Sequence, residues 1–167
     1  MKKIVKNGRI FTEAEDYQAD ILIEDEKIVC IGTDISDVDA EVIDAAGCYV
    51  LPGAVDVHTH MDLDVGISRA VDDFYDGTVA AVCGGTTSIV DHMAFGPAGI
   101  PLHYQFDVYR KLAEGKAVID YGFHGTAQHV DAEILAELET MAADGIPSVK
   151  AYLTYGFKLN DADVLQI

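Results

Sequence analysis

Two histidines separated by one residue are the strongest candidates for chemistry in this sequence. His58 and His60 end the apolar segment 54–60. Because side chains alternate along a β-strand, Asp56, His58 and His60 share one face. Two imidazoles at the carboxyl end of a strand can bind one metal ion, and parallel α/β folds bind their ligands at that end. The alternative is a pair of half-exposed polar residues that simply close a strand.

A lysine lies inside a second apolar segment. Lys150 belongs to the strand-like run 148–153. Desolvating an ammonium group is costly, so a lysine inside a barrel must be paired, neutralised or chemically altered. Burial also favours the free amine, which reacts with CO2 to give a carbamate. A carbamylated Lys150 would present a carboxylate able to bridge two hard cations, whereas a snorkelling or salt-bridged lysine is the simpler alternative.

The elements that must position these residues follow an alternating pattern from about residue 54 onward. Runs rich in Val, Ile and Tyr predict strands, and apolar residues three or four positions apart predict helices. This alternation is typical of a parallel sheet covered by helices. The predicted strands are 54–58, 86–91, 117–123 and 148–153, and the predicted helices are 71–82, 103–114 and 131–143.

The first 51 residues have a different texture, with short apolar runs and closely spaced turn signals. Asn7-Gly8 lies between the apolar pairs Ile4-Val5 and Ile10-Phe11. An Asn-Gly pair in this setting predicts a hairpin turn, because both central residues of a type I′ turn need positive φ. We therefore expect a small antiparallel sheet in this region.

Composition excludes several classes of partner. The 167 residues include 11 Lys and Arg against 29 Asp and Glu, which gives a net charge of −18. Such a charge repels nucleic acid and anionic bilayers, so neither is expected as a partner. The sequence contains no apolar run of about 18 residues, so no membrane span is predicted. The N-terminus has no apolar signal region, and the three cysteines, odd in number and widely spaced, predict reduced thiols in a cytoplasmic protein's core.

The motifs together resemble those of a known family. The run from Asp44 to His60 is similar to the entry signature of the amidohydrolase superfamily. The segments after it resemble the hydantoinase and dihydropyrimidinase family of cyclic amidases, closest to its D-hydantoinase (phenylhydantoinase) branch, over essentially the whole chain. These segments are Asp72-Asp73-Phe74, Gly77-Thr78, Gly84-Gly85-Thr86-Thr87-Ser88-Ile89-Val90-Asp91-His92 and Ser148-Val149-Lys150-Ala151-Tyr152-Leu153-Thr154-Tyr155.

The resemblance implies an α/β fold in two parts. Residues 1–52 would form a segment of a small β-sandwich domain. Residues 53–167 would form the first half, about four strands, of a TIM-type (β/α)8 metal-dependent hydrolase barrel, which needs about 250 residues when complete. The family also uses two histidines and an aspartate from later strands. We therefore expect the 167 residues to be part of a longer enzyme or a truncated chain, inactive by itself.

The resemblance also assigns roles to individual residues. His58 and His60 would bind the more buried of two divalent metal ions, usually zinc and sometimes manganese. Lys150, carboxylated on Nζ, would bridge the two metals. Tyr155 would contact the substrate carbonyl and stabilise the developing oxyanion. Leu63 and Tyr152, together with Met61, fall where the family contacts the substituent of the substrate ring.

Three polar residues near these positions are expected to play supporting roles. His92 and His124 end the second and third predicted barrel strands, but the family's metal ligands do not fall there. We expect structural or ligand-supporting roles for them. Asp56 faces the same way as His58 and His60, so it is a candidate for orienting one of the two imidazoles.

The activity implied is opening of a cyclic ureide or amide, such as a hydantoin or dihydropyrimidine, to an N-carbamoyl amino acid by a hydroxide that bridges the metals. The resemblance further implies a homotetramer for the full-length protein. Two alternatives stay open: an allantoinase or dihydroorotase-like amidohydrolase, and a non-catalytic dihydropyrimidinase-related assembly protein. The intact His58, His60 and Lys150 argue against the assembly protein.

Overall fold

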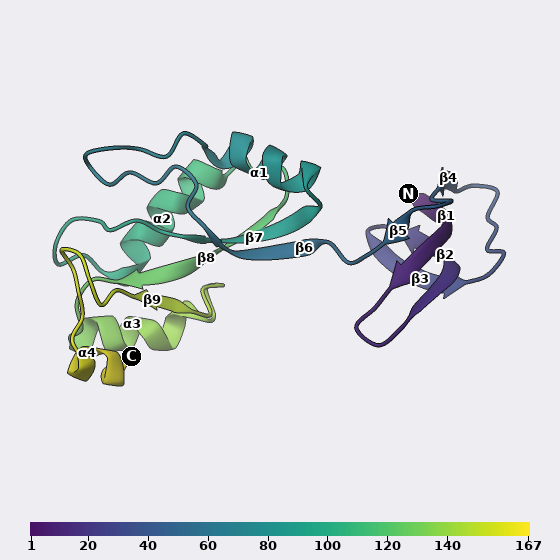
Figure 1. The fold of residues 1–167 in the computed structure, drawn as a ribbon. Coiled ribbons are helices and arrows are strands. Elements are labelled where there is room, and N and C mark those ends of the chain that lie inside the picture. Colours follow the sequence, from purple (N-terminus) through teal and green to yellow (C-terminus); the bar gives the residue numbers. More distant parts are fainter. The chain divides into compact units, whose positions relative to one another are not determined.

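A computed structural model describes residues 1–167 (Figure 1). The chain divides into two compact units, Met1–Pro52 and Gly53–Ile167. The first contains strands only, whereas the second combines strands and helices. None of the helices has both the length and the apolar character needed to cross a membrane.

The first unit is one five-stranded mixed sheet. Its strand order is β3-β2-β1-β4, and β5 also pairs with β1. Strands β2 and β3 continue the sheet antiparallel to their neighbours, whereas β4 and β5 run parallel to β1. Ile10, Ala19 and Ile21 form its buried apolar cluster. The strands are β1 (Lys2–Phe11), β2 (Asp16–Glu24), β3 (Lys27–Gly32), β4 (Glu41–Asp44) and β5 (Tyr49–Val50).

The predicted hairpin at Asn7-Gly8 is wrong. Both residues lie inside β1, where the register with β2 shifts between Val5 and Gly8 and Asn7 has a φ of 62°. The Asn7 amide donates to the Asp20 carboxylate at 2.9 Å, so the pair forms an irregularity in the strand. The chain reverses instead between β1 and β2, where the Thr12 amide donates to the Glu15 carbonyl at 2.9 Å. The expected antiparallel sheet is likewise corrected to a mixed one.

The cysteines also differ from expectation. Cys30, Cys48 and Cys83 are free thiols, but all three are exposed rather than part of a core. Cys30 lies in β3, an edge strand in which no side chain is buried. Its apolar sequence therefore does not indicate burial in this unit.

The second unit is a curled parallel sheet with helices between its strands, which confirms the predicted α/β half-barrel. The strand order is β6-β7-β8-β9. The strands are β6 (Ala54–Thr59), β7 (Thr86–His92), β8 (Asp120–Ala127) and β9 (Val149–Ala151), and the helices are α1 (Phe74–Cys83), α2 (Leu102–Ala113), α3 (Ala132–Met141) and α4 (Asp161–Gln166). The predicted strand 117–123 begins later, at Asp120, because the Lys116 and Ala117 amides still bond to the Ala113 carbonyl.

Helix starts are fixed by short polar side chains in three of the four helices. Asp73, Asp131 and Asn160 each accept hydrogen bonds from two amides of the first turn, which is why α1 begins at Phe74 and not at residue 71. Helix α2 has no such cap, since Pro101 precedes it. Its Leu102 amide donates instead to the Glu137 carboxylate of α3 at 2.5 Å.

The core of this unit lies between the helices and one face of the sheet. Phe74 of α1 and Tyr109 of α2 pack with Ile89, Met93 and Phe123 of the sheet and its exits. Contacts of α1 with α2 and of α2 with α3 place these helices along the same face. Since Ile89 and Phe123 point toward the helices, alternation directs the side chains of His92 and His124 to the opposite face.

Candidate active site

Four imidazoles gather on one face of three adjacent strands. His58, His60 and His92 lie at or next to the carboxyl ends of β6 and β7, whereas His124 lies inside β8, which continues to Ala127, and does not end its strand as expected. Ring centroids are 5.4 Å apart for His58 and His60, 4.4 Å for His58 and His92, and 5.3 Å for His60 and His92. His124 stacks on His92 with centroids 4.3 Å apart. The parallel register aligns His92 with His124, and Thr59 with Asp91, so these residues come level across the sheet.

The imidazoles of His60 and His92 are held in their neutral form. Burial, reinforced by Lys150 and the neighbouring histidines, lowers the pKa of His92 to about 4. Burial, His58 and Lys150 also lower the pKa of His60. The buried Nδ1 atoms of both rings have no hydrogen-bond partner. A neutral imidazole with an unpartnered nitrogen is the form that binds a metal ion.

His124 differs because protein groups occupy both of its ring nitrogens. Its Nε2 donates to the Val57 carbonyl at 2.9 Å, which leaves Nδ1 to accept from the Ser148 hydroxyl at 2.5 Å. His124 thereby ties β8 to β6 and to the residues before β9. Asp56 bonds to backbone and not to an imidazole, since its carboxylate accepts from the His58 amide at 3.0 Å.

Lys150 faces the same side of the sheet from β9. It pairs in register with Thr126 and is half-buried, and none of the ion pairs in the structure includes it. Thr126 lies two residues beyond His124 on the same face of β8, and His124 stacks on His92, so Lys150 continues the row of imidazoles across the sheet. Its Nζ is 5.2 Å from the centroid of the Tyr152 ring.

The residues expected to contact substrate differ in their distance from Lys150 and in their burial. Tyr152 adjoins Lys150, and its ring centroid is 5.9 Å from that of Tyr155. Tyr155 itself is 75% exposed and has a φ of 69°. Leu63 is partly buried and packs, with Met61, against the core around Phe74. The structure therefore places Tyr152 and Tyr155 near Lys150, whereas Leu63 packs against the apolar core around Phe74.

Donors for a metal ion are present but few. No three His, Cys, Asp or Glu side chains converge closely enough to hold an ion by themselves. The side chains that could contribute donors are the imidazoles of His58, His60 and His92, together with Lys150 if it carries a carboxylate. Neutral imidazoles beside an unpaired lysine fit this use, and additional ligands would be needed to complete a metal centre.

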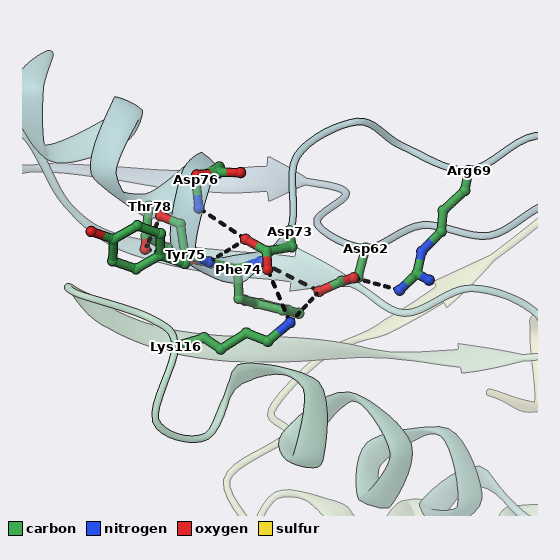
Figure 2. Close-up of polar contacts among 8 residues, drawn as sticks. All are labelled: Asp62, Arg69, Asp73, Phe74, Tyr75, Asp76, Thr78 and Lys116. Atoms are coloured by element: carbon green, nitrogen blue, oxygen red, sulfur yellow. Dashed lines mark hydrogen bonds and ion pairs between the residues drawn. The ribbon is translucent and has the colours of Figure 1, made fainter.

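Charged side chains anchor the loop that leaves β6 (Figure 2). Asp62 is buried, and its carboxylate binds the Arg69 guanidinium at 2.6 Å and lies 3.9 Å from the Lys116 ammonium. Lys116 also donates to Asp73, the N-cap of α1, at 3.0 Å. Inside the loop, the Ala70 amide donates to the Leu63 carbonyl at 2.7 Å. These contacts fix the segment that carries Leu63.

Helix α2 holds the segment that leaves β7. The Ala94 amide donates to the Tyr109 hydroxyl at 3.0 Å, and Gln105 donates to the Ala94 carbonyl at 2.6 Å. All three residues are buried, and burial raises the pKa of Tyr109 to about 12. Both backbone groups of Ala94, two residues after His92, are therefore satisfied by one helix.

Sequence reasoning missed one buried carboxylate beside the histidines. Asp91 is fully buried in β7, and burial raises its pKa to about 6. Its signal in the sequence is a single acidic residue that interrupts the apolar run 89–94 just before His92. Without the fold, nothing distinguishes it from a solvated strand end.

Comparisons with known proteins agree on one group of relatives, although no family model matches the chain. A D-phenylhydantoinase of Escherichia coli O1:K1 / APEC is 53% identical over an alignment of 167 positions that covers 99% of this chain and 36% of that protein. The crystal structure of dihydropyrimidinase from Brevibacillus agri NCHU1002 has 44% identity and a TM-score of 0.95, over 99% of this chain and 36% of that one.

A more distant match shares the fold of this chain and carries no information on its function. A dihydroorotase structure covers 92% of this chain and 43% of its own, with a TM-score of 0.61 and 17% identity, so it shares the fold alone. The chain spans about a third (36%) of the length of the hydantoinase relatives and corresponds to their N-terminal portion.

Proposed function

Because the chain belongs to the hydantoinase and dihydropyrimidinase family of the amidohydrolase superfamily, we propose that it supplies part of the active site of a metal-dependent cyclic amidohydrolase. The substrates would be hydantoins or dihydropyrimidines. Water would add across one ring C–N bond to give an N-carbamoyl amino acid. The observation that supports this most directly is the placement of His58, His60 and the unpaired Lys150 on one face of the sheet.

Each of these residues has a chemical task in the proposal. His58 and His60 would donate neutral imidazole nitrogens to a metal ion. The Lys150 amine would add CO2 and lose a proton, and the resulting carboxylate would bridge two ions. Bound zinc or manganese would supply Lewis acidity, which makes water nucleophilic at neutral pH and polarises the scissile carbonyl.

Tyr155 would stabilise the negative charge that develops on the carbonyl oxygen. Its hydroxyl would donate to that oxygen, the kind of contact that is strongest in the transition state. The ring pair Tyr152–Tyr155 supports this, since Tyr152 adjoins Lys150. Tyr152 and Leu63 would contact the ring substituent. We further propose that the whole protein is a cytoplasmic homotetramer and that the 167-residue chain alone has no turnover.

The metal site is tested on the 167-residue chain. With 13C-bicarbonate and Zn²⁺ present, NMR is expected to show a carbamate signal that Lys150→Ala abolishes. The same substitution should weaken Zn²⁺ binding by about tenfold or more, because it removes a ligand. Lys158→Ala is the control, since Lys158 is exposed beyond β9. Equal Zn²⁺ affinity in Lys150→Ala and the parent would overturn the assignment.

The reaction is tested on the product of the complete coding sequence that contains this chain. Hydantoin, dihydrouracil, allantoin and dihydroorotate are compared as substrates, with ring opening followed by chromatography. We expect turnover of hydantoin or dihydrouracil and its loss in Lys150→Ala. Turnover of allantoin or dihydroorotate alone would reject the proposed substrate class, and turnover by the isolated 167 residues would contradict their expected inactivity.

A further inference from the structure

Asp91 bonds to both residues that flank His60. One oxygen of its carboxylate, Oδ2, accepts from the Thr59 hydroxyl at 2.7 Å and from the Met61 amide at 2.8 Å. Thr59 and Asp91 are also direct neighbours in the register of β6 and β7. The residue is fully buried, so water does not compete for these bonds. His60 thus lies between two points that are fixed to the same atom.

The Met61 contact replaces one that the sheet does not provide. Strand β6 ends at Thr59, so the chain has left the ladder when it reaches Met61. A buried amide without a partner is costly, and a carboxylate acceptor gives a strong, charge-assisted bond. Without Asp91, the backbone on the far side of His60 would have no acceptor that fixes its direction.

The way Asp91 is held argues against a purely stabilising role. Its second oxygen, Oδ1, is buried and has no hydrogen-bond partner. A carboxylate with one unsatisfied buried oxygen is an unfavourable way to close a strand. Its value therefore lies in the position that it imposes on its partners.

We propose that Asp91 is a positioning residue for His60. By holding Thr59 and Met61 through one oxygen, it sets the backbone from which the His60 imidazole projects beside that of His58. This rests on the proposed function only in assigning His60 to a metal ion. The positioning itself concerns the chain without metal.

Four variants of the 167-residue chain test the proposal. Asp91→Ala removes both hydrogen bonds, and Thr59→Val removes one of them. Asp91→Asn keeps the size of the side chain and one acceptor oxygen. The control is Thr78→Val, because Thr78 is a fully buried threonine of α1 whose hydroxyl accepts from the Val118 amide at 3.1 Å, away from the histidines. Folding of each variant is verified by circular dichroism.

Two measurements separate positioning from stability. The first is the nuclear Overhauser effect between the His58 and His60 rings without metal, whose centroids are 5.4 Å apart in the structure. The second is the dissociation constant for Zn²⁺ alone, from competition with a chromogenic chelator. We expect Asp91→Ala to lose the effect and to weaken Zn²⁺ binding by about tenfold or more, as outer-sphere substitutions commonly do. Thr59→Val should lose less of the Overhauser effect and of the Zn²⁺ affinity, and Asp91→Asn should retain both at the level of the parent chain.

The outcomes are distinguishable. The inference is overturned if Asp91→Ala keeps the ring contact and the Zn²⁺ affinity of Thr78→Val. If Asp91→Ala does not fold and Thr59→Val does, the same result for Thr59→Val overturns it. If the parent chain binds no Zn²⁺, the metal assignment of the proposed function fails in this chain. The ring contact then decides the positioning role by itself: its loss in Asp91→Ala and return in Asp91→Asn support the role, and its persistence rejects it.

Discussion

Substitution of Tyr109 by phenylalanine removes one oxygen from the buried junction between α2 and the exit of β7. That oxygen accepts from the Ala94 amide at 3.0 Å, and Tyr109 is only 3% exposed. The ring and its packing against Phe74 and Phe123 are retained, so the change isolates the hydrogen bond. The Ala94 amide is left buried without a partner.

The cost follows from that unsatisfied amide. A buried donor that loses its partner destabilises a protein by about 1–3 kcal/mol. With a urea dependence of about 2 kcal/mol per molar, a loss of about 2 kcal/mol lowers the unfolding midpoint by about 1 M. All helices lie in Gly53–Ile167, so far-UV circular dichroism follows the unit that contains Tyr109.

Tyr121→Phe provides the matched control. Tyr121 lies in β8 and is 37% exposed, and no hydrogen bond of its hydroxyl is found in the structure. Its substitution should change stability by less than about 0.5 kcal/mol. Equal midpoints for the two variants would refute the reasoning, since they would mean that the Ala94 amide is satisfied without Tyr109.

Three further predictions concern other contacts of the second unit. Burial opposes protonation of His103, but its contacts with Asp144 and Glu137 raise its pKa above the unfolded value. The protonated side chain therefore stabilises the fold below the unfolded pKa of about 6.5, and this stabilisation is lost as pH rises through the folded pKa. The urea midpoints of the parent and of His103→Gln should differ more at about pH 5.5 than at about pH 8.5. Arg69→Met should speed amide hydrogen exchange in residues 63–72 by leaving Asp62 poorly paired, and unchanged exchange would show that the loop's own backbone bonds suffice. Gly53→Ala should destabilise by about 1–3 kcal/mol because its Cβ would lie 2.0 Å from Thr87 Oγ1, whereas Gly122→Ala, with open space around it, should not; equal urea midpoints for the two would count against this packing.

The sequence predicts most of the second unit because its signals are local. Alternation gives the shared face of His58 and His60, and the polar residue Asp131 marks a helix start where the structure has one. The strand that contains Lys150 is also anticipated, although it is shorter than the expected segment 148–153. These features depend on neighbours within a few residues.

The features that were missed depend on contacts between distant residues. Asn7-Gly8 carries a strong turn signal, but the Asp20 carboxylate thirteen residues away binds the Asn7 amide inside a strand. His124 was expected to have a structural role, but its partners Ser148 and Val57, 24 and 67 residues distant in sequence, could not be named in advance. Asp91 likewise acquires its partners from the end of β6 and the segment that follows it. No periodicity or turn rule contains such information.

The start of α2 has a consequence for how the chain is made on the ribosome. Helix α1 carries its own cap, Asp73, and can complete its first turn as soon as it emerges. Helix α2 relies on Glu137, which follows Leu102 by 35 residues. At synthesis rates of about 5–20 residues per second, the first turn of α2 waits on the order of seconds for that carboxylate. Assembly of this unit is therefore expected to pause until α3 has been translated, so that α2 and α3 fold as a pair.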